Sequence, residues 1–230
     1  MGILRPDERS EALDLNSPGF DIIGDVHGCH DQLVELLTAL GYRDTAGAFR
    51  HPNRQAIFLG DLIDRGPKQV EVLRTVRAMT EAGSAQVIMG NHEFNAVCWH
   101  TPNRSKAGEF LRPHNDKNAN QHAEFLRQIG AGSTDHREAV EWFATFPLWL
   151  DLGAVRLVHA CWDPQAMTGL GKSHLETDDF HAASERDSDP YLWVENLCKG
   201  PEVQLPHGHE FVDKDGHHRD RARFRWWDAR

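Results

Sequence analysis

Short apolar runs, each followed at once by glycine and polar residues, recur three times in the first hundred residues. They span 20–23, 56–59 and 86–89, and their length and composition are typical of buried strands. Helical periodicity follows the first of them, and Gly41 is expected to end that helix. Its apolar face comprises Leu33, Leu36, Leu37 and Leu40. Strand, loop and helix therefore alternate, which predicts an α/β fold.

Two more helices are expected to complete this repeating pattern. The second should begin with Pro67 at its first helical position and end at Gly83. Its buried stripe is predicted to be Val70, Leu73 and Val76. The third should run through Val97 and Trp99. Each of the three units would thus place a polar loop between a strand and a helix.

Beyond residue 100 the pattern is weaker. A polar stretch near 101–120 predicts an insertion over the site, and 168–190 predicts a loop. The other expected elements are helices over 124–129 and 138–146, a hairpin of 148–152 with 155–158, and a strand end and turn over 212–217. Residues 1–19 are expected to form a polar N-terminal segment before one domain, 20–230.

Composition narrows the classes of protein. The chain has 230 residues, 40% of them hydrophobic, and a formal net charge of −10. No apolar stretch approaches the roughly 18 residues of a membrane span, and the N-terminus lacks a secretory signal pattern. Four scattered cysteines suit a reducing compartment, so a cytoplasmic protein without membrane association is expected. The acidic charge argues against strong binding of duplex nucleic acid, and the basic stretch 219–225 is interpreted as a solvated strand face.

The candidate chemistry lies in the loops that follow the three strands. They read Gly24-Asp-Val-His-Gly28, Gly60-Asp-Leu-Ile-Asp-Arg-Gly-Pro67 and Gly90-Asn-His-Glu93. Glycine permits a sharp turn at each strand end, so carboxylates, imidazoles and an amide should gather at one edge of the sheet. Mixed oxygen and imidazole donors suit manganese, iron or zinc better than calcium. The pattern therefore predicts a metal centre.

In this order, the three motifs resemble the signature of the calcineurin-like metallophosphoesterases, over about residues 20–162. The similarity is greatest to the phosphoprotein-phosphatase-like branch, which includes bacterial serine/threonine phosphatases, diadenosine-tetraphosphate hydrolases and polynucleotide kinase phosphatase domains. The resemblance implies two packed sheets with helices outside and a site for two divalent metal ions, with manganese expected. It also implies hydrolysis of a phosphate ester or anhydride by hydroxide bridging the two metals.

The resemblance assigns the metal ligands residue by residue. The first metal is expected to take Asp25, His27 and Asp61, and the second Asp61, Asn91 and His159, so Asp61 would bridge them. A carboxylate shared by two metals is compatible with known two-metal sites. Taken singly, an aspartate after glycine is often only a turn former. The residues after His159 are Ala160 and Cys161, where the protein-phosphatase branch often has two glycines.

The resemblance also implies catalytic roles for three residues of these motifs. His92 would protonate the leaving oxygen. Asp64 would orient the imidazole of His92 and raise the pKa of that imidazole. Arg65 is suited to clamp phosphate oxygens, because its planar fork binds them bidentately. The alternative for Asp64 and Arg65 is a surface ion pair. Asn91 is a further candidate contact to phosphate, whereas Glu93 is expected only to begin a helix.

The expected substrate is a small phosphorylated molecule of nucleotide type, and the sequence gives no oligomeric state. Two alternatives remain, a serine/threonine protein phosphatase and a catalytically weak metal-binding or regulatory module. The family's second metal normally takes one more histidine from a late Gly-His pair, here Gly208-His209. Pro206 interrupts the approach to that pair, so we expect the family's last strands to be missing and His209 not to be a ligand. His209 as the sixth ligand is the competing interpretation.

Overall fold

The computed structural model describes residues 19–212, 218–223 and 225–228. The expected N-terminal segment, apart from Gly19, and the turn over 213–217 lie outside the described residues. The largest sheet has three parallel strands in the order β1 (Gly19–Ile23), β4 (Arg54–Phe58) and β5 (Ala85–Val87). The predicted α/β class is confirmed, and the three apolar runs form the three strands.

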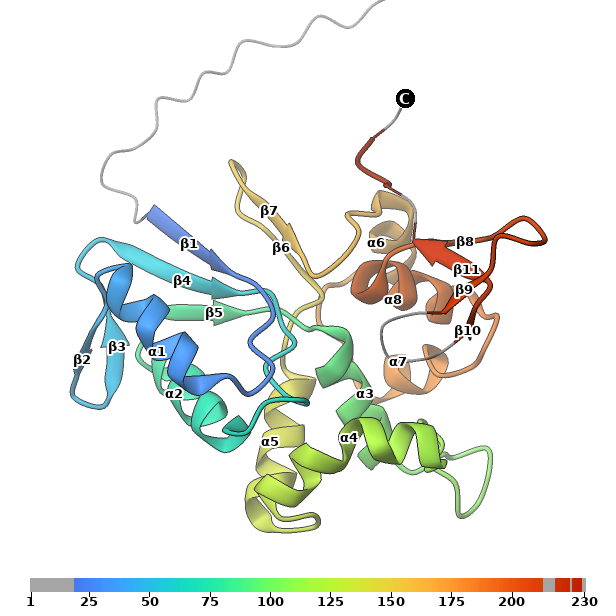
Figure 1. The fold of residues 1–230 in the computed structure, drawn as a ribbon, viewed down its shortest axis with the longest axis horizontal. Coiled ribbons are helices and arrows are strands. Elements are labelled where there is room, and N and C mark those ends of the chain that lie inside the picture. The colour runs from blue at the N-terminus through green and yellow to red at the C-terminus, as the bar shows by residue number, and fades with distance from the viewer. Residues whose placement is uncertain (1–18, 213–217, 224, 229–230) are drawn as a thin grey trace, which may run out of the picture.

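The sheet is the centre of the core. Ala56, Ile57 and Phe58 of β4 are fully buried, as expected for a strand with a neighbour on both edges. Parallel strands need crossover connections, and two helices provide them: α1 (His30–Ala39) and α2 (Gln69–Glu81). Both lie on the same side of the sheet (Figure 1), and the strands all run toward the centre of the molecule, where the third motif begins.

Two details of these helices differ from the sequence prediction. Leu36 is exposed, so the apolar face of α1 is narrower than its periodicity indicates. Pro67 is not helical, because the backbone beside it is held by the first motif loop: Gly66 N–H donates to His27 O over 2.8 Å and Lys68 N–H donates to Gly28 O over 3.0 Å. The helix can begin only after these bonds.

The third helix, α3 (Asn91–His100), is confirmed and begins within the third motif. The helix expected over 124–129 begins earlier than predicted, because α4 (Asp116–Ile129) includes the end of the polar stretch 101–120. Asn115 caps it by accepting from Asn118 N–H over 2.9 Å, and Ser133 caps α5 (Thr134–Ala144) in the same way. Both caps are residue types that favour helix starts.

The predicted hairpin is present as β6 (Trp149–Asp151) and β7 (Arg156–Val158), and it leads directly to His159. The loop predicted over 168–190 is wrong. That region contains parts of α6 (Pro164–Leu170) and α8 (Asp189–Lys199) and all of α7 (Thr177–Ala182). Asp163 and Ser188 cap α6 and α8, and each is followed by a proline in the first turn. Polar composition concealed these start signals.

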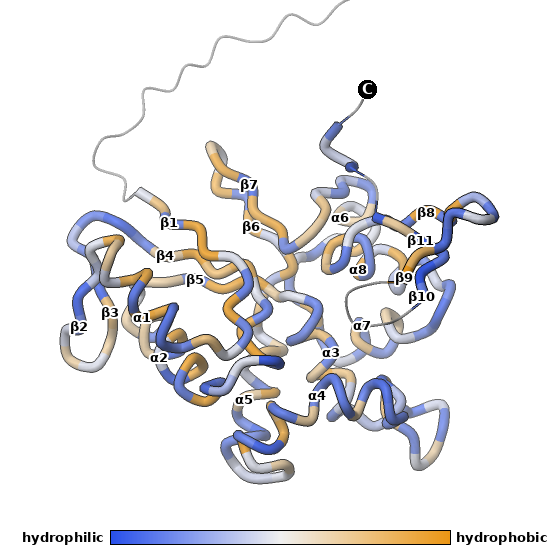
Figure 2. Tube along the Cα trace, in the orientation of Figure 1, coloured by the Kyte–Doolittle hydropathy of each residue, from blue (hydrophilic) through white to orange (hydrophobic). Residues whose placement is uncertain are grey.

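Short two-stranded ladders complete the described chain. They are β2 (Arg43–Thr45) with β3 (Ala48–Arg50), β8 (Glu202–Gln204) with β11 (Arg221–Arg223), and β9 (Phe211–Val212) with β10 (His218–Arg219). Apolar residues concentrate in the central sheet, and hydrophilic residues line α4 and the outer loops (Figure 2). Among the described helices, none has the length and apolar character needed to cross a bilayer.

A polar cluster beside β1 offers a test of the packing. Asp21 is 9% exposed and accepts hydrogen bonds from Arg54 Nε over 2.7 Å and Tyr42 Oη over 3.1 Å. Asp21→Asn should lower the free energy of unfolding at pH 7 by about 1–2 kcal/mol, because a charge-assisted bond is lost. Denaturant titration of wild type and variant, both in chelator, measures the difference.

The same cluster fixes the pH dependence of that difference. The Arg54 bond holds the pKa of Asp21 below its ordinary value of 3.8. The contribution of Asp21 to the free energy of unfolding is therefore present above pH 3.8 and is lost as the pH falls below that value. The difference in the free energy of unfolding between wild type and Asp21→Asn should therefore become smaller in acid. Asp31→Asn, which removes an exposed pair with Lys68, should have little effect at either pH. A constant gap for Asp21 would contradict this account.

Candidate active site

The ends of β1, β4 and β5 bring the three motif loops together. Backbone bonds join the first two loops: His27 N–H donates to Asp61 O over 2.8 Å, and Gly28 N–H donates to Leu62 O over 2.8 Å. The second and third loops meet through glycines. A Cβ added at Gly60 would lie 2.2 Å from Gly90 N, and one at Gly90 would lie 2.3 Å from Asp61 Oδ1. Only glycine permits this approach.

Four of the predicted site residues have left-handed backbone conformations. Their φ angles are +46° for His27, +54° for Asp61, +64° for Asp64 and +75° for Arg65. Such angles are uncommon outside glycine and persist where the surrounding structure enforces them. Clustering of these angles in two loops that also carry the polar motifs is typical of a functional site.

Asp61 lies at the centre of the site. Its Oδ2 is 3.7 Å from His27 Nε2, 3.8 Å from His92 Nε2 and 3.6 Å from His159 Nε2. Asp25 Oδ2 is 3.8 Å from His27 Nε2. The structure therefore brings together residues from four loops that lie far apart in the sequence, from Asp25 to His159.

The tautomers of two histidines suit metal binding. The Nδ1 atoms of His27 and His159 lie 2.8 Å from Ile63 O and 2.6 Å from Leu59 O. A backbone carbonyl can only accept, so each Nδ1 carries the proton and each Nε2 presents a lone pair toward Asp61. His27 Nε2 is buried without a hydrogen-bond partner, and burial lowers the pKa of His27. These donors fit divalent metal ions.

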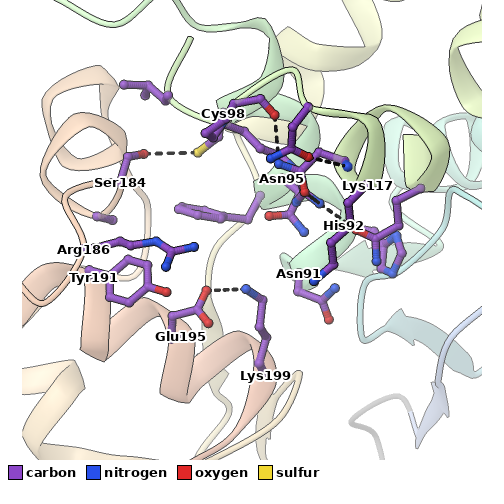
Figure 3. Close-up of a pocket in the computed structure, with 18 of the residues that line it drawn as sticks. Asn91, His92, Asn95, Cys98, Lys117, Ser184, Arg186, Tyr191, Glu195 and Lys199 are labelled. Atoms are coloured by element: carbon purple, nitrogen blue, oxygen red, sulfur yellow. Dashed lines mark hydrogen bonds and ion pairs between the residues drawn. The ribbon is translucent and has the colours of Figure 1, made fainter. Parts of the chain in front are cut away.

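Two groups of donors could each hold a metal ion among the described residues, and Asp61 belongs to both. One contains His27, Asp61 and His92, and the other contains Asp25, Asp61 and His159. Asp61 is the carboxylate common to both groups, and Asp25, which is grouped with His159, also lies 3.8 Å from His27 Nε2. His209 is in neither group and is exposed, and the short exposed strand β8 precedes it. Asn91 lines a cavity that Asp25, Asp61 and His159 also line (Figure 3).

His92 differs from the other two histidines in its partner. Its Nδ1 lies 2.5 Å from Asp64 Oδ2, and a second imidazole, His122 Nδ1, lies 3.1 Å from Asp64 Oδ1. Burial opposes ionisation of Asp64, but the bonds from His122 and His92 keep its pKa below the ordinary value. Burial also opposes protonation of His92, yet the Asp64 bond raises the pKa of His92 above its ordinary value. The pair can thus deliver a proton from Nε2.

His122 is a site residue that the sequence analysis missed. It is buried on α4 with Phe125 and Ile129, at spacings of three and seven residues. The signal was therefore present: a histidine on an apolar helix face must find a polar partner or stay unsatisfied. The partner, Asp64, is 58 residues away.

Glu93 is the second residue whose role was missed. It is fully buried, and its carboxylate accepts from Asp61 N–H and Leu62 N–H, each over 2.8 Å, and from Gly90 N–H over 3.2 Å. Burial and the neighbouring Asp61 charge raise the pKa of Glu93 to about 7. Glu93 thus positions Asp61 by holding its backbone.

Arg65 and four of the metal-binding candidates line one large cavity of about 1590 Å³; the four are Asp25, Asp61, Asn91 and His159. Its other walls come from the loop after α3, the first turns of α4, the α7–α8 region and the C-terminal strands. Figure 3 shows the walls formed by α3, α4 and the α7–α8 region. Typical small-molecule sites measure about 300–1,000 Å³. The cavity is therefore large enough for a substrate that extends well beyond one phosphoryl group.

The Asp64–His122 contact predicts a measurable positioning effect. In His122→Leu, Asp64 keeps only one of its two imidazole donors, so its hold on His92 loosens. We expect kcat to fall about tenfold for an alkyl phosphate, the usual effect of losing an outer-shell partner, and to fall less for p-nitrophenyl phosphate. His122→Gln, which retains a donor, should recover part of the loss. Equal losses for both substrates would contradict the positioning role.

Comparisons with known proteins place the chain among phosphoesterases. The calcineurin-like phosphoesterase family model matches residues 19–229. An asymmetrical bis(5'-nucleosyl)-tetraphosphatase, PrpE, from Halalkalibacterium halodurans is 51% identical over 74 residues, covering 32% of this chain and 30% of that protein. A symmetrical bis(5'-nucleosyl)-tetraphosphatase from Janthinobacterium is 28% identical over 184 residues, covering 76% of this chain and 58% of that protein.

Among solved structures, a cold-active protein-tyrosine phosphatase from Shewanella has a TM-score of 0.46 and 19% sequence identity, covering 80% of this chain and 51% of that one. The chain thus spans 30% to 58% of the length of the two tetraphosphatases. The family model covers nearly all of it. This protein belongs to the calcineurin-like phosphoesterase family.

Proposed function

We propose that this protein hydrolyses a phosphate ester or anhydride of nucleotide type with the help of two divalent metal ions. The observation that carries the proposal is the Asp61 carboxylate, with three imidazole Nε2 atoms 3.6–3.8 Å from it. Asp25, His27, Asp61, Asn91 and His159 would hold the metals. Bound there, the ions would polarise the phosphoryl group and activate water for attack. Manganese is the leading expectation for both positions.

The protein's own side chains would then do the remaining work. Arg65 would bind the non-bridging phosphate oxygens through its guanidinium fork and offset the charge that develops on them. His92 Nε2 would give its proton to the leaving oxygen, while Asp64, bonded to Nδ1, would hold the ring and stabilise its charged form. Because water is the nucleophile in this scheme, no covalent phosphoenzyme should form.

Two features favour a nucleotide-type substrate. The cavity exceeds the space that a simple phosphomonoester needs, and the curated relatives described above act on bis(5'-nucleosyl) tetraphosphates by name. A role as a metal-binding module without turnover is opposed by the intact Asp64–His92 pair, because a scaffold would not need a proton donor.

The test is hydrolysis by the purified chain with manganese and after chelation. Wild type should release p-nitrophenol from p-nitrophenyl phosphate only when metal is present. A panel of dinucleoside polyphosphates, phosphopeptides and 2′,3′-cyclic nucleotides should show the highest kcat/KM for a dinucleoside polyphosphate. A preference for phosphopeptides would overturn the substrate class in favour of a protein phosphatase. Turnover that survives complete metal removal would overturn the proposed chemistry.

A further inference from the structure

One arginine of the cavity wall is held in an unusual way. Arg112 is half-buried, and its Nη2 donates only to neutral amide oxygens, Gln121 Oε1 over 2.7 Å and Asn118 Oδ1 over 3.2 Å. Among the described residues it forms no ion pair. Burial lowers the pKa of this guanidinium, and the charges of Asp64 and Glu195 offset that effect only in part. A charge in this state is suited to a negatively charged partner.

The surroundings of Arg112 are arranged for an anion. Its backbone N–H donates to Cys98 O over 3.0 Å, which anchors the main chain of this residue to α3. Lys117, on the first turn of α4, lines the same cavity and has no ion pair within the described part of the chain. Asn118 and Gln121 supply amides that keep the Arg112 side chain fixed in place. Fixed donors lose little entropy on binding.

The position of this cluster relates it to the site around Asp61. Arg112 and Arg65 line one continuous cavity, and the charge of Asp64 is close enough to act on Arg112. Figure 3 shows Lys117 on the α4 side of the cavity, with Asn91 and His92 on the adjoining wall formed by α3. An anion at Arg112 would therefore share the cavity with a phosphoryl group at Arg65.

We propose that Arg112, assisted by Lys117, forms a second anion subsite that binds a non-reacting phosphate of an oligophosphate chain. This rests on the proposed function, because it takes Asp61 and Arg65 as the place of the reacting phosphoryl group. The subsite would make the enzyme prefer substrates with at least two linked phosphates over monoesters. Contacts to remote parts of a substrate are a known source of such specificity.

The experiment uses two inhibitors of p-nitrophenyl phosphate hydrolysis at fixed free manganese: inorganic phosphate, and methylenediphosphonate, which has two linked phosphoryl groups and cannot be hydrolysed. Arg112→Gln should raise the Ki of methylenediphosphonate about tenfold, the effect of one lost charge-assisted bond. The Ki of phosphate and kcat/KM for p-nitrophenyl phosphate should stay within about twofold. Arg112→Lys should recover part of the loss. Arg127→Gln, at a surface pair with Glu124, is the matched control.

The outcomes separate the subsite from the proposed function. Equal changes for both inhibitors, or no change for either, would overturn the subsite while leaving the hydrolase intact. If wild type does not hydrolyse p-nitrophenyl phosphate, the proposed function fails, and calorimetry of methylenediphosphonate binding still compares wild type with Arg112→Gln. A thermal midpoint matching wild type shows that Arg112→Gln is folded. The source of the phosphates is distinguished by comparing kcat/KM of wild type for inorganic tripolyphosphate and for diadenosine tetraphosphate. For whichever of the two wild type prefers, kcat/KM should fall about tenfold in Arg112→Gln.

Discussion

Asp61→Asn is expected to remove most of the bound metal and to lower kcat on the order of 10³-fold, because metal ions contribute several kcal/mol of transition-state stabilisation. The carboxylate at the centre of three imidazoles would lose its charge while keeping its shape. Asparagine also accepts the left-handed backbone that Asp61 adopts, with φ +54°. The substitution therefore tests charge and not folding.

Metal content by mass spectrometry and turnover of p-nitrophenyl phosphate give the two readouts. Asp151→Asn, which changes an exposed carboxylate in the β6–β7 hairpin, should leave both unchanged. A variant at Asp61 that keeps two metals per chain and a near-normal rate would show that this residue does not bridge them. Loss of metal with an unchanged rate would remove metals from the mechanism altogether.

His92→Ala is expected to keep its metal and to lose kcat by about 10²–10⁴-fold for an alkyl phosphate, the range for a general acid. His92 Nδ1 lies 2.5 Å from Asp64 Oδ2, so Nε2 is the atom free to protonate a leaving group. p-Nitrophenol leaves readily without a proton, so the loss for its ester should be much smaller.

The comparison of two leaving groups provides an internal control for this variant. Any general damage to the cavity would lower both rates by the same factor. A preserved metal content with unequal losses would support the acid role, and equal losses would contradict it. Large metal loss in His92→Ala would instead place His92 among the ligands, as its grouping with His27 and Asp61 allows.

Local patterns predicted the three strands of the central sheet and the helices that follow them, although not the β2–β3 ladder. The apolar runs and the helical spacing of Leu33 and Leu37 predicted the strands and α1, because burial of an apolar face depends on residues near each other in sequence. The helices in the second half of the chain were harder to predict from the sequence. Helices α6 and α7 are short, and α8 begins within the polar stretch 168–190, so the stability of these helices depends on capping residues such as Asp163 and on contacts with α3 and each other.

The sequence by itself determined that Asp25, His27, Asp61 and Asn91 stand at strand ends, since parallel strands bring such ends to one edge of a sheet. Only the tertiary structure decided what surrounds them. The packing of α4 brings His122 to Asp64, the burial of Glu93 holds the backbone of Asp61, and the loop after α3 carries Arg112 into the cavity. These contacts join residues 31 to 58 positions apart or different walls of one cavity. They depend on how whole helices pack, which periodicity and motif spacing do not encode.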